Sequence, residues 1–136
     1  MNENIIIVDF GSQVTKLIAR RIRDFGVFSQ IIPFNNLNEK SFKISDVKGL
    51  IFSGGPSSVG NDNAPEIKNF VYKLNIPILG VCYGLQLICR DFGGQVKLSR
   101  EREFGKTKVK ILKNSPLFKN AYTKGHQYKV WMSHSD

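Results

Sequence analysis

Short apolar runs alternate with amphipathic stretches over the first two-thirds of the chain. The apolar runs predict strands at residues 5–8, 28–33, 49–52 and 76–81. Apolar residues at helical spacing predict a helix over residues 15–25, a second beginning at Pro65 (Ile67, Phe70, Val71, Leu74), and a third after Cys82 (Leu85, Ile88, Cys89, Phe92). This alternation predicts an α/β fold, a doubly wound and mostly parallel sheet with helices on both faces.

The pattern changes after Gln95, where short alternating strands are predicted at residues 96–98, 106–111 and 129–132. Gly26 stands where a glycine ends a helix, and residues 35–46 form a polar connection. A length of 136 residues fits one domain, so we expect a single domain over residues 1–136 without an internal linker.

Basic residues outnumber acidic ones by 20 to 11, which gives a net charge of +9. Such a surplus suits a polyanionic partner, but the basic residues are scattered. One predicted strand carries basic residues at every second position (Lys106, Lys108 and Lys110), which predicts that this face of the strand is exposed to solvent. A nucleic-acid site interleaves aromatic residues with such charges, and no aromatic residue separates these lysines, so we expect no nucleic-acid partner. No apolar run approaches the ~20 residues of a membrane span, which leads us to expect a cytoplasmic protein.

Two cysteines bear on chemistry. Cys82 and Cys89 lie two helical turns apart, about 10.5 Å along a helix axis, which is too far for a disulfide bond. Without histidines at ligand spacing they form no metal site. Cys89, on the apolar face of its helix, reads as a small buried residue. Cys82 is then a candidate lone nucleophile.

Residues 80–84, Gly-Val-Cys-Tyr-Gly, form a nucleophile elbow between a predicted strand and a predicted helix. Such a turn lifts the thiol above the sheet, at a helix N-terminus that favours the thiolate. Ser53-Gly54-Gly55-Pro56 follows a neighbouring strand, and its backbone N–H groups suit an oxyanion hole. Taken alone, this loop could also be a simple turn or a phosphate nest. It lacks the lysine of a Walker loop, and residues 9–12 lack the glycine spacing of a dinucleotide site.

These motifs resemble the class I (triad-type) glutamine amidotransferases, and within them the glutaminase domains of GMP synthetases. The resemblance rests on residues 80–86 and 53–56 and on three further segments, residues 9–23, 102–105 and 130–134. It implies that Cys82 attacks the carboxamide of glutamine and that the N–H groups of Gly55 and Tyr83 hold the oxyanion. Substrate-binding residues implied in the same way are Gly54, Gln86, Ser133, His134 and Ser135.

The same resemblance implies partners and cofactors. The glutaminase part needs no cofactor, and its ammonia passes to a synthetase domain, in cis or in trans, that uses ATP and Mg²⁺ to convert XMP into GMP. No such ATP-pyrophosphatase domain is present within residues 1–136.

The sequence departs from the family at the base of the triad. A His-x-Glu pair normally follows the Ser-His segment on a later strand, but the sequence stops at Asp136 and holds only His126 and His134. His134-Ser135-Asp136 has the right spacing, yet it aligns with the substrate loop, where Ser135 replaces a family glycine. We therefore expect an incomplete domain that lacks its C-terminal strands and alone hydrolyses glutamine very poorly or not at all. Its exposed apolar surface should leave it either marginally stable or associated with other copies.

Three other interpretations remain open from the sequence. The first is a non-catalytic relative that binds glutamine or a synthetase partner. The second is a nucleic-acid-binding module, which only the charge suggests. The third is a redox cysteine protein, for which no resolving group near Cys82 is evident.

Overall fold

The computed structural model describes residues 3–40 and 43–134, and the chain divides into two compact units, Met1–Val96 and Lys97–Asp136. The first unit holds β1 (Asn4–Asp9), α1 (Val14–Asp24), β2 (Phe28–Pro33), β3 (Val47–Phe52), α2 (Phe70–Lys73), β4 (Ile78–Gly80) and α3 (Tyr83–Asp91), with 3₁₀ turns at Phe34–Asn36 and Ile44–Asp46. The second unit holds β5 (Glu103–Lys110), a 3₁₀ turn at Pro116–Phe118 and β6 (Gln127–His134).

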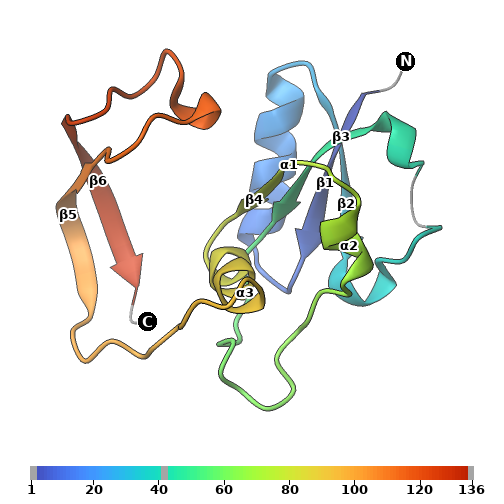
Figure 1. Cartoon of the computed structure of the whole chain (residues 1–136), viewed down its shortest axis with the longest axis horizontal. Coiled ribbons are helices and arrows are strands. Elements are labelled where there is room, and N and C mark those ends of the chain that lie inside the picture. Colours follow the sequence, from blue (N-terminus) through green and yellow to red (C-terminus); the bar gives the residue numbers. More distant parts are fainter. Residues whose placement is uncertain (1–2, 41–42, 135–136) are drawn as a thin grey trace. The chain divides into compact units, whose positions relative to one another are not determined.

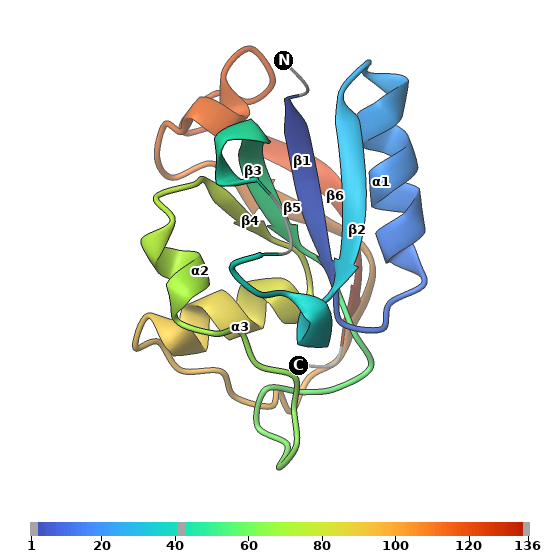
Figure 2. The same ribbon diagram turned by 90° about the vertical axis from the view of Figure 1, so that its right-hand side faces the viewer.

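The first unit is built on a four-stranded sheet in the order β2-β1-β3-β4, and every pair in it is parallel. Helix α1 lies on one face of the sheet, and α2 and α3 lie on the other (Figures 1 and 2). This confirms the predicted α/β fold with a parallel sheet and helices on both faces.

The two faces of β1 bury different residues because side chains alternate along a strand. Ile6 and Val8 are fully buried in the main core, together with Val71 of α2 and Leu87 of α3. Ile7, between them, is also fully buried, on the face that α1 covers. A strand buried on both faces accounts for the uninterrupted run of β-branched residues in the sequence.

Helix α1 buries only part of the predicted apolar stripe: Ile18 and Ile22 are half-buried, but the fully buried positions are different ones. Its buried residues are the small ones, Thr15 and Ala19, whereas Leu17 is 52% exposed and Phe25 is 86% exposed. The carbonyl oxygen of Ala19 accepts a hydrogen bond from the Ser29 hydroxyl of β2 at 2.9 Å. Small side chains on this face let the helix approach the strand closely enough for that bond.

The second helix is much shorter than the sequence predicts. A helix was expected to begin at Pro65, but α2 covers only Phe70–Lys73. No side chain caps its N-terminus, and the carbonyl oxygen of Pro65 is taken by the Tyr83 hydroxyl. Ile67 and Val71 are buried all the same, so the apolar positions pack in the core without a continuous helix.

Three other features differ from the predictions: the length of β4, the presence of a strand at residues 96–98, and the residues that α3 buries. Strand β4 covers three residues where six were expected, and the predicted strand at residues 96–98 is wrong, since this stretch has no regular structure. In α3, the predicted apolar residues Leu85 and Phe92 are 59% and 72% exposed, and the helix buries Tyr83, Gly84 and Leu87 instead. The helix does end at the expected glycines: the N–H of Gly93, at φ +86°, donates to Arg90.

The second unit is an antiparallel hairpin of β5 and β6, in which Glu103 pairs with His134 and Lys110 with Gln127. Strand β6 extends beyond both ends of the predicted strand at residues 129–132, whereas β5 begins before the predicted strand at residues 106–111 and ends one residue earlier. Lys106, Lys108 and Lys110 are exposed, as expected for a solvated face. Their cross-strand neighbours include Trp131, whose ring lies 5.5 Å from the Lys106 Nζ.

Candidate functional site

The carboxyl ends of β1, β3 and β4 form one edge of the sheet, because parallel strands end on the same side. Val8 of β1 is paired with Phe52 of β3, and Phe52 with Gly80 of β4. The chain leaves these strands through residues 9–12, 53–57 and 81–82. The structure therefore brings together the three segments that carry the motifs of this unit, where open α/β sheets place their sites.

Cys82 sits at the junction of β4 and α3 as the N-cap residue, with φ 51° and ψ −119°. This backbone conformation is unfavourable for a residue with a side chain. The two flanking glycines are required by their surroundings. A Cβ on Gly80 would lie 2.7 Å from Leu85 Cα, and one on Gly84 would lie 2.1 Å from the carbonyl oxygen of Phe52. Cys82 itself is an exposed residue with a free thiol.

The Tyr83 N–H group lies at the N-terminus of α3. Gly84 donates to the Ser53 carbonyl at 3.1 Å, and Leu85 and Gln86 both donate to the Cys82 carbonyl. Within the described part of the chain, the Tyr83 N–H, next to the thiol, has no acceptor. A free N–H beside a nucleophile can bind an anion or a polarised carbonyl oxygen.

The loop after β3 lies against the elbow. A Cβ built on Gly54 would lie 3.4 Å from both the Cys82 Cβ and the Ser12 Oγ. Gly55 rests on Phe10, whose carbonyl oxygen would be 2.5 Å from a Gly55 Cβ. Among the described residues the Gly55 N–H also has no acceptor. Gly54 thus lies beside Cys82, and Gly55 follows it in the same loop.

A buried hydroxyl chain fixes the start of this loop. Ser53 and Thr15 are fully buried and their hydroxyl oxygens are 2.8 Å apart. The Thr15 hydroxyl donates to the Asp9 carboxylate at 3.0 Å, so the Ser53 hydroxyl is the donor to Thr15. The same carboxylate accepts the Gly11 N–H at 2.8 Å. Asp9 therefore orders the ends of β1 and β3 together.

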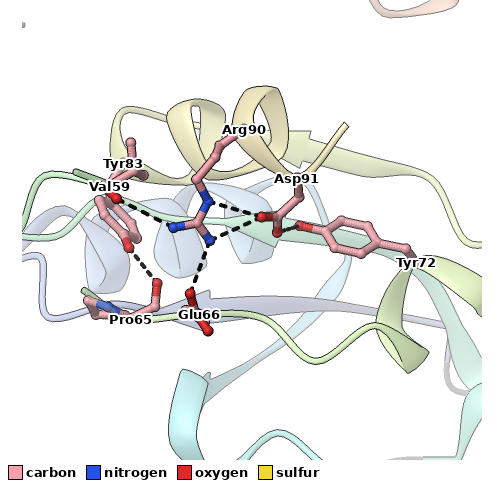
Figure 3. Close-up of polar contacts among 7 residues, drawn as sticks. All are labelled: Val59, Pro65, Glu66, Tyr72, Tyr83, Arg90 and Asp91. Atoms are coloured by element: carbon pink, nitrogen blue, oxygen red, sulfur yellow. Dashed lines mark hydrogen bonds and ion pairs between the residues drawn. The ribbon is translucent and has the colours of Figure 1, made fainter. Parts of the chain in front are cut away.

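The far side of α3 is joined to the segment between the Ser53 loop and α2 by the polar contacts drawn in Figure 3. The Tyr83 hydroxyl donates to the Pro65 carbonyl, and Arg90 donates to the Val59 carbonyl at 3.4 Å. Arg90 also pairs with Glu66 at 3.6 Å and with Asp91 at 3.0 Å. These contacts hold the segment that follows the loop on the helix that follows the thiol.

Two tyrosines of this region have raised pKa values. Burial raises the pKa of the Tyr83 phenol. For Tyr72 burial is the larger cause, and its hydrogen bond to the Asp91 carboxylate at 2.6 Å raises the pKa further. Both phenols are therefore neutral at physiological pH.

The remaining candidate residues are more widely distributed. Gln86, one turn into α3, is half-buried. Ser133 and His134 belong to β6 of the second unit, where the His134 Nε2 lies 3.3 Å from the Glu103 Oε2. Ser135 lies outside the described residues. His126 is exposed.

Several residues of the site escaped the sequence analysis. Thr15 was counted only as the start of a helix, and Ser12 only as part of a turn. Arg90 lay on a helix face judged only by its apolar residues. The sequence carries no signal for Thr15, because the predicted apolar stripe of this helix leaves both Thr15 and Ala19 outside it.

Other kinds of site find little support in the described residues. Residues 3–40 and 43–134 contain no group of three His, Cys, Asp or Glu side chains that could hold a metal ion. No helix within those ranges has the length and apolar character to cross a membrane. Cys89 is half-buried, and its Sγ lies 4.0 Å from the Gln95 carbonyl oxygen.

Comparison with known families gives one match over almost the whole chain. The model of the family "Glutamine amidotransferase class-I" matches residues 6–136. A GMP synthase [glutamine-hydrolyzing] of Agrobacterium fabrum is 48% identical over 134 residues, which are 98% of this chain and 25% of that protein. The corresponding protein of Rhodopseudomonas palustris is 46% identical over 136 residues, all of this chain and 25% of its own length. The chain thus spans about a quarter of the length of these curated relatives.

Solved structures agree with this match. A Thermoplasma acidophilum protein, described as one of the subunits of GMP synthase, is 30% identical, with a TM-score of 0.74 over 99% of this chain and 66% of its own. A glutamine amidotransferase of Thermotoga maritima has the same TM-score at 14% identity, over 99% of this chain and 61% of its own, and bears on the fold alone.

Proposed function

Because the chain belongs to the class I glutamine amidotransferases, we propose that it is the glutamine-hydrolysing part of a GMP synthase, with Cys82 as the nucleophile. The observation that carries this proposal is the position of Cys82. Cys82 is exposed at the N-terminus of α3, on a backbone with φ 51°, next to a Tyr83 N–H without an acceptor among the described residues. In this proposal residues 1–136 belong to one glutaminase domain.

The reaction follows from these groups. The Cys82 thiolate attacks the side-chain carbonyl carbon of glutamine, and the carbonyl electrons move to oxygen, which the N–H groups of Gly55 and Tyr83 stabilise. The C–N bond then breaks, and the nitrogen leaves as ammonia after taking up a proton. Water adds to the thioester, releases glutamate and restores the thiol. Each oxyanion donor is worth roughly 10²–10³-fold in rate.

Substrate selection falls to the residues around this centre. Gly54, whose α-carbon faces the Cys82 Cβ, leaves room for the carboxamide because any side chain there would contact the nucleophile. We assign the amino-acid end of glutamine to Gln86 and to Ser133, His134 and Ser135. In the second unit, the His134 Nε2 lies 3.3 Å from the Glu103 Oε2 and can donate a hydrogen bond to it.

Residues 1–136 contain no evident general base to activate the Cys82 thiol. The histidines of the chain are His126 and His134, neither of them in a His-x-Glu pair. Loss of a triad base costs 10³-fold or more. We infer that this 136-residue chain binds glutamine but turns it over very slowly.

Chemical rescue tests this inference. Imidazole added to the chain replaces the missing general base, a role worth 10²–10⁴-fold when the base is positioned. We expect ammonia release to rise with imidazole concentration and to vanish in Cys82→Ala. Fast turnover without imidazole, or turnover that survives Cys82→Ala, would show that another group does the work.

The ammonia released at Cys82 is used by a second part of the proposed enzyme. In the proposed enzyme it passes to a synthetase part that consumes ATP and converts XMP into GMP, in purine biosynthesis. The curated relatives, of which this chain spans 25%, carry the name GMP synthase, which supports a synthetase part in cis. The Thermoplasma acidophilum protein is described as a subunit, which supports the same partnership in trans.

A second candidate function is a non-catalytic relative that binds glutamine or a synthetase partner. It is favoured by the same absence of a His-x-Glu pair in residues 1–136. The two functions differ at the thiol. Covalent capture of a glutamine-like electrophile by Cys82 supports the enzyme, whereas tight glutamine binding with an unreactive thiol supports the non-catalytic relative.

A further inference from the structure

The two N–H groups assigned to the oxyanion belong to segments far apart in the sequence. Gly55 lies in the loop after β3, and Tyr83 opens α3. An oxyanion hole requires donors 2.7–3.1 Å from the developing charge. Their separation must therefore be set by packing between the two segments.

Phe10 lies under one of these donors. Its carbonyl oxygen is 2.5 Å, and its Cβ 3.0 Å, from the position of a Cβ on Gly55, so the Gly55 backbone rests directly on Phe10. Phe10 is 3% exposed, and its ring packs on Phe34 at 5.7 Å and on Phe52 at 6.1 Å. Gly55 therefore cannot move toward the core unless Phe10 moves.

The side chain of Tyr83 lies beneath the other donor. It is 3% exposed, and its ring centroid is 5.2 Å from that of Phe10, nearer than the rings of Phe34 and Phe52. Its hydroxyl donates to the Pro65 carbonyl, and Arg90 holds Val59 and Glu66 from the same helix (Figure 3). The Tyr83 side chain is thus fixed at both ends.

We propose that Phe10 and the side chain of Tyr83 are positioning residues, whose ring contact sets the spacing of the Gly55 and Tyr83 N–H groups. The proposal rests on the function proposed above. A smaller side chain at residue 10 lets the main chain of that residue, on which Gly55 rests, shift toward the core, while removal of the Tyr83 hydroxyl frees the first turn of α3 from Pro65. Either change moves a donor without touching the thiol.

Two electrophiles that react with Cys82 distinguish a misplaced oxyanion donor from a general loss of thiol reactivity. A chloroketone analogue of glutamine forms a tetrahedral adduct whose oxyanion needs both N–H groups, and Cys82 then displaces chloride. Iodoacetamide is attacked at its methylene carbon, loses iodide and needs no oxyanion donor. The ratio of the two rate constants at Cys82 therefore reports the oxyanion hole in folded protein. Because the thiol of an unfolded chain still reacts with iodoacetamide, the ratio is compared only among variants that thermal unfolding shows to be folded.

The variants are Phe10→Leu, Tyr83→Phe and, as a matched control, Phe70→Leu, which removes a ring packed against the same core. We expect the chloroketone-to-iodoacetamide ratio to fall about tenfold in Phe10→Leu and about threefold in Tyr83→Phe, a fraction of the value of one donor. The control should keep the wild-type ratio. Thermal unfolding identifies any variant that does not fold, and Tyr83→Phe retains the ring in case Phe10→Leu fails.

The outcomes distinguish the two proposals. If the chloroketone does not label the wild-type protein at Cys82, the proposed function is wrong. If it labels the wild type and the folded variants keep the wild-type ratio, the function stands and the positioning role is wrong. A ratio that falls equally in Phe70→Leu would also overturn it, because general loosening of the core would then explain the effect.

Discussion

The backbone N–H of Gly84 donates a hydrogen bond to the carbonyl oxygen of Ser53 at 3.1 Å. This contact joins the first turn of α3 to the loop after β3, and so joins the segment that carries the nucleophile to the segment that carries Gly55. It is possible only because residue 84 has no side chain, since a Cβ there would lie 2.1 Å from the Phe52 carbonyl oxygen.

Gly84→Ala should therefore disrupt both the fold and the site. Relief of the overlap requires a shift of α3 from β3, and we expect the free energy of unfolding to fall by about 3 kcal/mol. Urea denaturation measures this loss. Gly60→Ala is the matched control, because nothing lies within 4 Å of a Cβ at that position. Equal effects of the two substitutions would contradict the close approach at Gly84.

Backbone strain at Cys82 makes a prediction about stability. Its φ of 51° and ψ of −119° suit glycine better than any other residue. Cys82→Gly should raise the free energy of unfolding by about 1 kcal/mol relative to Cys82→Ala, while both variants lose all reactivity at this position. Denaturant titration of the pair checks this, and a Cys82→Gly variant less stable than Cys82→Ala would argue against a strained elbow.

The buried chain Asp9–Thr15–Ser53 should respond to loss of one hydroxyl. Thr15→Val keeps the shape of the side chain but removes hydrogen bonds to Asp9 and Ser53. Because the partners remain buried, the expected cost is about 2 kcal/mol. Thr123→Val, at an exposed position, serves as the control and should change the stability by less than about 0.5 kcal/mol. Calorimetry of both variants distinguishes a structural chain from a coincidental contact.

Tyrosine ionisation should weaken the fold at high pH. Burial raises the pKa of Tyr72 above the ordinary value of 10.0, and the bond to Asp91 raises it further. The unfolded chain therefore loses this proton at lower pH than the folded one. The stabilisation is complete below about pH 10 and is lost as the pH rises through the folded pKa. Tyr72→Phe removes this contribution.

The measurement is the difference in unfolding free energy between wild type and Tyr72→Phe as a function of pH. We expect the wild-type protein to lose stability more steeply than the variant above about pH 10. Parallel curves over that range would mean that the Tyr72 phenol titrates alike in both states.

Much of the fold could be predicted because parallel strands buried on both faces leave an unambiguous pattern. The strands at residues 5–8, 28–33 and 49–52 were located to within two residues at each end. The buried face of each helix was harder to predict from the sequence. The sequence favours Leu17 and Phe25 as core residues of α1, but close approach to β2 favours the small Thr15 and Ala19. Tertiary packing determines which face of α1 is buried, and the hydropathy of the sequence does not reveal that packing.

Some residues of the candidate site could also be predicted from the sequence, and others could not. Gly80, Cys82 and Gly84 were recognisable because the elbow requires those residue types at fixed spacing. The contacts that order the site come from residues without such a motif. Tyr83 bonds to Pro65, which stood at the start of a predicted helix, and Thr15 bonds to Ser53, 38 residues away. Contacts of this kind depend on the folded chain.

The central proposal is that Cys82 is an accessible nucleophile in a site that binds glutamine. Its most direct test is the rate at which a chloroketone analogue of glutamine labels the protein, followed by mass spectrometry of the modified peptide. We predict one equivalent of label on Cys82, none on Cys89, and a rate that falls as free glutamine is added. Labelling on Cys89, or labelling of Cys82 that glutamine does not slow, would contradict the claim.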